Sequence, residues 1–168
     1  MSTFYMEVAP LPKLTDDHLR EVGALARCVH SINDIRFREL GLQRGQFIFL
    51  TRVVEHPGLN LIELSAMLRV DKTTTTKAVQ KLLAAGLLAR ERDAADKRMW
   101  RLVPTERALA VYPQIIAEEN RCLDACLAGF SGEERTAARR LLARMRANIE
   151  QLWQDMKTSR GEDHDDND

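Results

Sequence analysis

The 168-residue sequence lacks several features that would assign a protein to a large class at once. Its three cysteines, Cys28, Cys122 and Cys126, form a sparse and odd set that excludes a disulfide scaffold and fits a reducing compartment. No apolar run approaches the roughly 18 residues that a membrane span needs. The first residues lack the basic and then apolar pattern of a signal peptide. We therefore expect a cytoplasmic protein without a membrane partner.

The sequence also lacks the patterns on which most catalytic and metal sites depend. It contains no nucleophile paired with a base and an orienting group, and no phosphate-binding loop. The four histidines, His18, His30, His56 and His164, show no ligand spacing. We predict that the protein is not an enzyme and needs neither a cofactor nor a metal.

The chain also lacks a net charge, since its formal charge at pH 7 is +0. The charges are nevertheless unevenly distributed along the sequence. Residues 69–101 hold nine basic and four acidic residues, whereas residues 161–168 hold five acidic residues and no Lys or Arg. A basic centre of this kind is typical of a surface that binds nucleic acid.

The stretch from Val70 to Gly86 predicts a helix that enters a DNA groove. Asp71 can cap its first turn, and Gly86 can close its last turn in a left-handed conformation, with Leu87 following as the apolar contact. Thr75, Ala78, Val79, Leu82 and Leu83 share one face at helical spacing and predict the buried side. Threonines on the other faces can bond to phosphates and base edges.

Neighbouring segments place this helix in a winged helix-turn-helix. A helix at about 61–68, which Asn60 and Glu63 can cap, joins it through the tight link Arg69-Val70. Residues 87–92 and 99–103 can pair as a hairpin around the polar loop 93–98. A second helix is expected at 43–55, where the sequence His56-Pro57-Gly58 ends it.

Longer helices flank this unit on both sides. We expect one of roughly 25 residues capped by Thr15, a fifth that begins at Thr105 with a kink or restart at Pro113, and a sixth opened by a capping box at Ser131 and Glu134. Their broad apolar faces exceed what the winged unit can cover, which predicts a helical bundle shared by two subunits.

The predicted fold is thus mainly α with a small β-hairpin wing, and it combines a winged helix-turn-helix with an N- and C-terminal helical dimerisation bundle. The expected organisation is an extended arm (1–14), a dimerisation helix (15–41), the DNA-binding region (42–104), C-terminal dimerisation helices (105–157) and an acidic disordered tail (158–168).

Over about residues 15–156 the chain resembles the MarR family, the multiple antibiotic resistance type of winged-helix regulator. The wing carries the closest match, Asp93-Ala94-Ala95-Asp96-Lys97-Arg98 followed by a strand and Pro104-Thr105. Asp71 to Lys77 match the family's recognition helix, and Gln46-Phe47 match the start of its second helix. Ala108 departs from the glycine of many members. The resemblance implies a homodimeric regulator, usually a repressor, that binds a pseudo-palindromic operator and leaves it when a small, often anionic aromatic, effector binds.

Candidate DNA contacts follow from this reading. Arg98 at the wing tip suits a narrow minor groove, and Asp96 can pair with it and hold it in position. Arg92 is a further candidate for a phosphate contact. The full set of predicted DNA-contacting residues is Lys72, Thr73, Thr74, Thr76, Lys77, Lys81, Arg90, Asp96, Lys97 and Arg98.

Effector and redox residues are less constrained. The candidates for an effector pocket are His30, Asp34, Arg38, Phe49 and Trp100, each of which can equally be structural.

Some family members sense peroxide through a thiol near Cys28, but His30 points away from it on a helix, so a small buried residue is the favoured interpretation. Cys122 and Cys126 share a face with Glu118 and Glu119 nearby, which leaves a metal or redox site there as an alternative to packing. The two alternative functions are a cysteine-based redox-sensing regulator and a winged-helix protein-interaction module.

Overall fold

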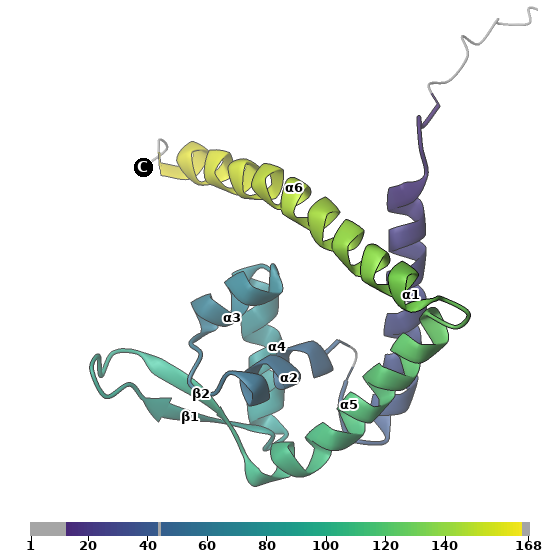
Figure 1. The fold of residues 1–168 in the computed structure, drawn as a ribbon. Helices are drawn as coiled ribbons and strands as arrows, with labels where there is room; N and C mark the ends of the chain where they lie inside the picture. Colours follow the sequence, from purple (N-terminus) through teal and green to yellow (C-terminus); the bar gives the residue numbers. More distant parts are fainter. Residues whose placement is uncertain (1–12, 44, 166–168) are drawn as a thin grey trace, which may run out of the picture. The chain divides into compact units, whose positions relative to one another are not determined.

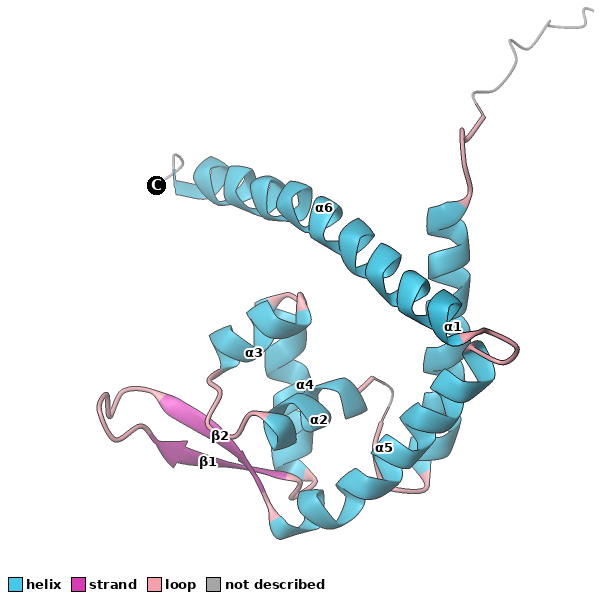
Figure 2. Cartoon of the chain, viewed as in Figure 1, coloured by secondary structure: helices cyan, strands magenta, loops and turns pink. Residues whose placement is uncertain are grey.

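The computed structural model describes residues 13–43 and 45–165, which form six helices and one two-stranded antiparallel sheet (Figures 1 and 2). The elements are α1 (His18–Arg38), α2 (Phe47–Glu55), α3 (Leu61–Leu68), α4 (Lys72–Ala84), β1 (Leu88–Arg92), β2 (Trp100–Pro104), α5 (Glu106–Cys126) and α6 (Gly132–Asp165). The chain divides into two compact units, Met1–Asn120 and Arg121–Asp168. The mainly helical fold with a hairpin wing is therefore confirmed.

The core of the first unit lies between α2, α3, α4 and the hairpin. Leu50, Val53, Leu64, Val79 and Leu82 are completely buried. Leu87 and Leu102, just before β1 and within β2, are buried with them. Burial of these side chains is the main force that holds the hairpin on the helices, since each contributes about 1.5–3 kcal/mol.

Local capping explains where α3 and α4 begin and end. The Asn60 side chain accepts the N–H groups of Ile62 and Glu63, and the Glu63 carboxylate accepts the N–H of Asn60, so the predicted capping box is present. Arg69 then adopts a left-handed conformation with φ 55°. Asp71 accepts the N–H of Thr74 at 2.8 Å, and Gly86 follows α4 with φ 67°. The Asn60–Glu63 box, the Asp71 cap and the left-handed Gly86 confirm the turn chemistry predicted from the sequence, which does not predict the left-handed Arg69.

Loss of the α3 cap should lower stability measurably. We expect Asn60→Ala to reduce the free energy of unfolding by about 1 kcal/mol, because two N–H groups of the first turn lose their acceptor. Urea denaturation followed by circular dichroism measures the change. Gln80→Ala, an exposed replacement on α4, is the control and should stay within about 0.5 kcal/mol of the parent. An unchanged midpoint for Asn60→Ala would mean that the cap does not stabilise α3.

The wing is a regular hairpin with a fixed register. Leu88 faces Pro104, Arg90 faces Leu102 and Arg92 faces Trp100. The edge of β2 that faces away from β1 forms two backbone hydrogen bonds with the α2–α3 loop. The N–H of Leu102 donates to the Leu59 carbonyl at 2.9 Å, and the N–H of Gly58 donates to the Leu102 carbonyl at 2.8 Å. The base of the wing is therefore joined to the helix-turn-helix by backbone hydrogen bonds.

Two predicted helix starts are wrong by a few residues. α1 begins at His18 after Asp17 rather than at a Thr15 cap, because Asp16 accepts the N–H of His18 at 2.9 Å and so favours a local turn. α2 begins at Phe47 rather than at residue 43, because Gly45 has φ 70° and the Gln46 side chain accepts the N–H of Gln43 in a separate turn.

The C-terminal helices begin at the predicted caps, but α5 differs from expectation at Pro113. The Thr105 hydroxyl accepts the N–H of Ala108 at 3.3 Å, and α5 continues through Pro113 without the predicted restart. Pro113 and Leu109 are exposed, so water can reach the side of the helix where proline removes a hydrogen bond. The Ser131–Glu134 capping box is present.

α6 extends to Asp165, although we expected an acidic disordered tail from residue 158. Adding residues to an existing helix needs no new nucleus. Residues 1–12 of the predicted arm and 166–168 of the tail lie outside the described residues. No described helix meets the length and apolarity that crossing a membrane requires.

Candidate nucleic-acid interface

Helix α4 presents one buried and one polar face. Thr75 is completely buried, and its hydroxyl donates to the Asp71 carbonyl at 3.0 Å, so the predicted inward orientation of this threonine is confirmed. Thr76 is half-buried, and its hydroxyl donates to the Lys72 carbonyl at 2.8 Å. The remaining predicted contact residues of this helix are exposed, and they are Lys72, Thr73, Thr74, Lys77 and Lys81. α4 therefore exposes three ammonium groups and the side chains of Thr73 and Thr74, the latter bonded to the Asp71 carboxylate that caps the helix.

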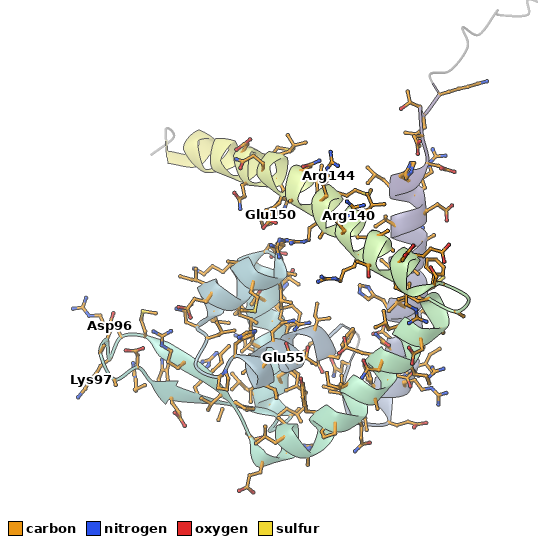
Figure 3. All side chains as sticks on the ribbon, viewed as in Figure 1. Glu55, Asp96, Lys97, Arg140, Arg144 and Glu150 are labelled. Atoms are coloured by element: carbon orange, nitrogen blue, oxygen red, sulfur yellow. The ribbon has the colours of Figure 1, made fainter. Side chains whose placement is uncertain are left out.

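The wing tip carries the second group of predicted residues. Asp96 and Lys97 lie at the outer end of the hairpin (Figure 3), and Arg98 beside them is exposed. Asp96 accepts the backbone N–H of Arg98 at 2.9 Å instead of forming the predicted ion pair with its guanidinium. The short loop uses this carboxylate to close its turn. Within the described residues the Arg98 guanidinium has no protein partner, which leaves it available to a ligand.

The two arginines of β1 differ from each other. Arg90 is exposed. Arg92 lies over the ring of Trp100, 3.8 Å from its centroid, and donates to the Lys97 carbonyl at 2.6 Å. Arg92 thus helps to order the wing tip, and Trp100 forms part of the wing rather than lying beside the other predicted effector residues.

The wing has a further cluster around Asp93. One carboxylate oxygen accepts hydrogen bonds from the N–H groups of Ala95 and Asp96, both at 2.8 Å, and the other accepts one from the Nε–H of Arg101. The bond from Asp96 has the largest effect, followed by those from Arg101 and Ala95, and together they lower the pKa of Asp93 to about 2. No local pattern in the sequence indicates the partners of Arg101, which contributes there only to the basic charge of residues 69–101.

The predicted effector residues do not form one pocket. Asp34 and Arg38 line a cavity of about 480 Å³ together with Leu42. Phe49 is buried and lines a different cavity of about 320 Å³ beside α4. His30 lines neither of these two cavities. It is exposed, and its ring packs edge-on against that of Phe47, with 6.4 Å between the ring centroids.

The second of these cavities combines apolar walls with positive charge. Its lining residues are Gly45, Gln46, Ile48, Phe49, Val70, Thr74, Lys77, Ala78 and Lys81. Lys77 and Lys81 are also predicted DNA contacts, so an occupant of this cavity would lie against the same helix face.

The cysteines differ in exposure. Cys28 is exposed in the single chain, so the burial expected for it is not found within one subunit. Cys122 is buried and Cys126 is exposed.

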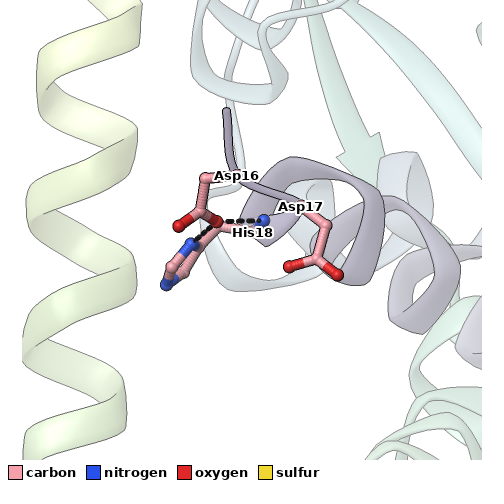
Figure 4. A group of neighbouring side chains, drawn as sticks. All are labelled: Asp16, Asp17 and His18. Carbon is pink, nitrogen blue, oxygen red and sulfur yellow. Dashed lines mark hydrogen bonds and ion pairs between the residues drawn. The ribbon is translucent and has the colours of Figure 1, made fainter. Parts of the chain in front are cut away.

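Among the described residues, the His, Cys, Asp and Glu side chains that come together as a possible ligand group are Asp16, Asp17 and His18 (Figure 4). All three are exposed. The hydrogen bond between Asp16 and His18 raises the pKa of His18, while two bonds from His18, the backbone N–H first, lower that of Asp16.

Comparison with known proteins agrees with this geometry. The model of the MarR family matches residues 40–99. The HTH-type transcriptional regulator YybA of Bacillus subtilis (strain 168) is 38% identical over 149 residues, which cover 89% of this chain and 99% of the relative. A MarR protein from Peptoclostridium difficile is 48% identical, with a TM-score of 0.82 over 93% of this chain and 99% of that one.

A MarR family regulator from Listeria monocytogenes, solved in complex with 26mer DNA, has a TM-score of 0.83 and 34% identity over 86% of this chain and 96% of its own. The aligned regions of these relatives cover 86–93% of this chain and so include the helices on both sides of the winged unit. The chain belongs to the MarR family, and it is a winged-helix, DNA-binding transcription regulator rather than an enzyme.

Proposed function

We propose that the chain is a cytoplasmic homodimeric repressor that binds a pseudo-palindromic operator and is released by a small aromatic or anionic effector. The observation that carries the DNA-binding part is the pairing, in one compact winged unit, of the exposed polar face of α4 with the exposed tip of the wing. An α-helix fits the major groove, and an arginine on a hairpin fits a narrow minor groove. The Listeria relative in complex with DNA supports the same use of this fold.

Within this proposal, the contact residues divide by groove. Lys72, Thr73, Thr74, Lys77 and Lys81 of α4 meet the major groove and its phosphates. Thr76 contributes through its exposed edge, because its hydroxyl is bonded to the helix backbone. Lys97 and Arg98 reach the minor groove, Asp96 orders their loop, and Arg90 lies at the phosphates beside β1.

The homodimer is supported by apolar side chains that the described chain leaves in water. α1 exposes Leu19, Val22, Leu25, Ile32 and Ile35, with exposed fractions of 39–72%. α6 exposes Leu141, Leu142, Ile149, Leu152 and Met156, with exposed fractions of 47–62%. Such stripes at helical spacing on two long helices are typical of a subunit interface. We therefore assign residues 15–41 and 105–157 to dimerisation and residues 42–104 to DNA binding.

Effector release is supported by the two cavities in the first unit. The one that contains Phe49 offers aromatic and aliphatic walls with Lys77 and Lys81, and the one that contains Asp34 offers the Arg38 guanidinium. The cavity that contains Phe49 suits a small anion that carries an apolar ring, because the charged residues that line it are both lysines. His30 and Trp100 take no part in either cavity.

An exposed Cys28 keeps a redox-sensing regulator as the second candidate function. Release of DNA by peroxide, abolished in Cys28→Ser, would favour it over a small-molecule effector. Release by an aromatic acid that is unaffected by Cys28→Ser would exclude it.

A gel shift on the DNA upstream of the chain's own gene tests the proposal directly, with a footprint to locate the site. We expect a protected, two-fold symmetric site whose half-site centres lie one helical turn apart, roughly 34–36 Å. A chain that binds protein partners but shifts no specific DNA would instead be the interaction module. Loss of reporter expression when the chain is present distinguishes a repressor from an activator.

Binding should also depend steeply on salt. A dimer that neutralises about six to ten phosphates loses roughly 10³–10⁵ in affinity between 50 mM and 200 mM salt. Lys81→Ala should reduce the slope of log K against log salt by about 2 per dimer, because each subunit contributes one exposed ammonium group. Fluorescence anisotropy over a salt series provides the measurement. A flat salt response would contradict the assignment of these lysines to phosphates.

A further inference from the structure

Arg101 on β2 connects three parts of the winged unit. Its guanidinium donates to the Asp93 carboxylate at the start of the wing loop, to the Gly58 carbonyl at 3.2 Å and to the Glu63 carboxylate on α3 at 3.0 Å. The Arg101 side chain is 31% exposed and that of Asp93 is 13% exposed. One side chain therefore spans from the wing loop to the first helix of the helix-turn-helix.

Each partner of Arg101 is itself fixed by further bonds. The Glu63 carboxylate accepts the N–H of Asn60 at 2.8 Å as part of the α3 capping box. The Asp93 carboxylate accepts the N–H groups of Ala95 and Asp96 in the wing loop. Asp96 in turn accepts the N–H of Arg98. A continuous series of hydrogen bonds thus runs from the start of α3, through Arg101, to the backbone of Arg98.

Other contacts hold the wing differently. The backbone bonds between Leu102 and residues 58–59 join the base of β2 to the helices. Arg92 acts within the wing, where it contacts Trp100 and the Lys97 carbonyl. Among the side-chain hydrogen bonds of the described residues, those of Arg101 link the loop at the outer end of the wing to α3.

We propose that Arg101 is a positioning residue for DNA binding. It holds the wing tip in the position and orientation, relative to α4, in which Arg98 and α4 can contact the duplex together. The proposal rests on the proposed role of Arg98. Its physical basis is preorganisation: a tip that is already placed loses less conformational freedom when it binds. Because partly exposed ion pairs contribute little to folding, the effect should fall on binding.

The neighbouring charges dictate which replacement is informative. Removing the guanidinium altogether leaves Asp93 and Glu63 unneutralised near the phosphates, so a neutral variant mixes repulsion with loss of position. Arg101→Lys keeps the charge, but a single ammonium cannot serve the three acceptors with the fixed fork of a guanidinium. It therefore separates position from charge.

The test is a double-mutant cycle on the full chain, with a labelled duplex from the region upstream of its own gene as the probe. Arg98→Ala should weaken binding at least tenfold in the parent and less than about threefold in the Arg101→Lys background, since a misplaced tip loses less when its arginine is removed. Lys77→Ala on α4 is the matched control and should cost the same factor in both backgrounds. The thermal midpoint of Arg101→Lys should stay within about 4 °C of the parent.

The outcomes separate the two proposals. If Arg98→Ala costs the same factor in both backgrounds, Arg101 does not position the tip, and the role of Arg98 stands. If Arg98→Ala has no effect in the parent, the minor-groove role fails, and the role of Arg101 fails with it. Coupling of Arg101→Lys to Lys77→Ala as strong as that to Arg98→Ala would indicate a general structural role and would also overturn the inference.

A binding-independent readout accompanies the cycle. The Asp93 carboxyl should titrate near pH 2 in the parent when it is followed by NMR, because the N–H of Asp96, the Arg101 side chain and the N–H of Ala95 all favour its charged form. Arg101→Met should raise this pKa. An unchanged pKa would show that Arg101 does not contact Asp93 in solution.

Discussion

Replacing Arg98 by alanine should weaken operator binding at least tenfold, equivalent to about 1.4 kcal/mol or more. The expected loss is specific to binding, because the guanidinium is exposed and meets no partner within the described residues. Its free fork can enter a narrow A·T-rich minor groove, where the negative potential is strongest. The loop behind it is already ordered by Asp93 and Asp96, so little freedom is lost when the arginine binds.

Anisotropy titrations at constant salt measure the change. Arg144→Ala is the matched control, since it removes one exposed arginine from α6 (Figure 3), outside the winged unit, and should leave the affinity within about twofold. Circular dichroism should give the same helix content for both variants. Equal affinities of Arg98→Ala and the parent at physiological salt would remove Arg98 from the interface.

The winged unit was predictable from the sequence because local interactions decide its boundaries. Asn60 with Glu63, and Asp71 with Gly86, act within a few residues of themselves, and the structure has the caps that the sequence predicted. The inward orientation of Thr75 also follows from helical spacing alone. Such agreement between local propensity and fold is expected where no functional strain intervenes.

Side-chain partners across the fold could not be predicted in the same way. Arg101 and Glu63 are 38 residues apart, and no spacing rule connects them. The expected pair of Asp96 with Arg98 failed because a loop carboxylate bonded to the nearest free N–H instead. Likewise, the exposure of Cys28 depends on which surfaces a helix meets rather than on its own sequence.

The second large effect should follow from placing a charge in the apolar stripe of α6. Ile149 is 54% exposed in the single chain, a large apolar surface to leave in water. If a second subunit covers it, Ile149→Glu buries an unpaired carboxylate at the interface, which is strongly unfavourable. We expect the variant to elute as a monomer near 19.1 kDa in light-scattering chromatography, where the parent elutes as a dimer.

Loss of the dimer should then reduce DNA binding far more than any single contact. Two linked recognition helices bind their half-sites with an effective concentration in the millimolar range, and their separation costs about 10²–10⁴ in affinity. Leu25→Glu on α1, at 49% exposure, should have the same two effects if both helices form the interface.

Ala147→Glu provides the matched control on α6. This exposed residue lies roughly opposite Ile149 around the helix, so the same charge added there should leave both the mass and the affinity unchanged. Both glutamate variants of α6 must keep the helix content of the parent, because the winged unit has its own buried core. If Ile149→Glu remains dimeric, the stripe of α6 is not the interface. If it is monomeric but binds the operator as tightly as the parent, the requirement for paired half-sites is wrong, and one winged unit suffices for recognition.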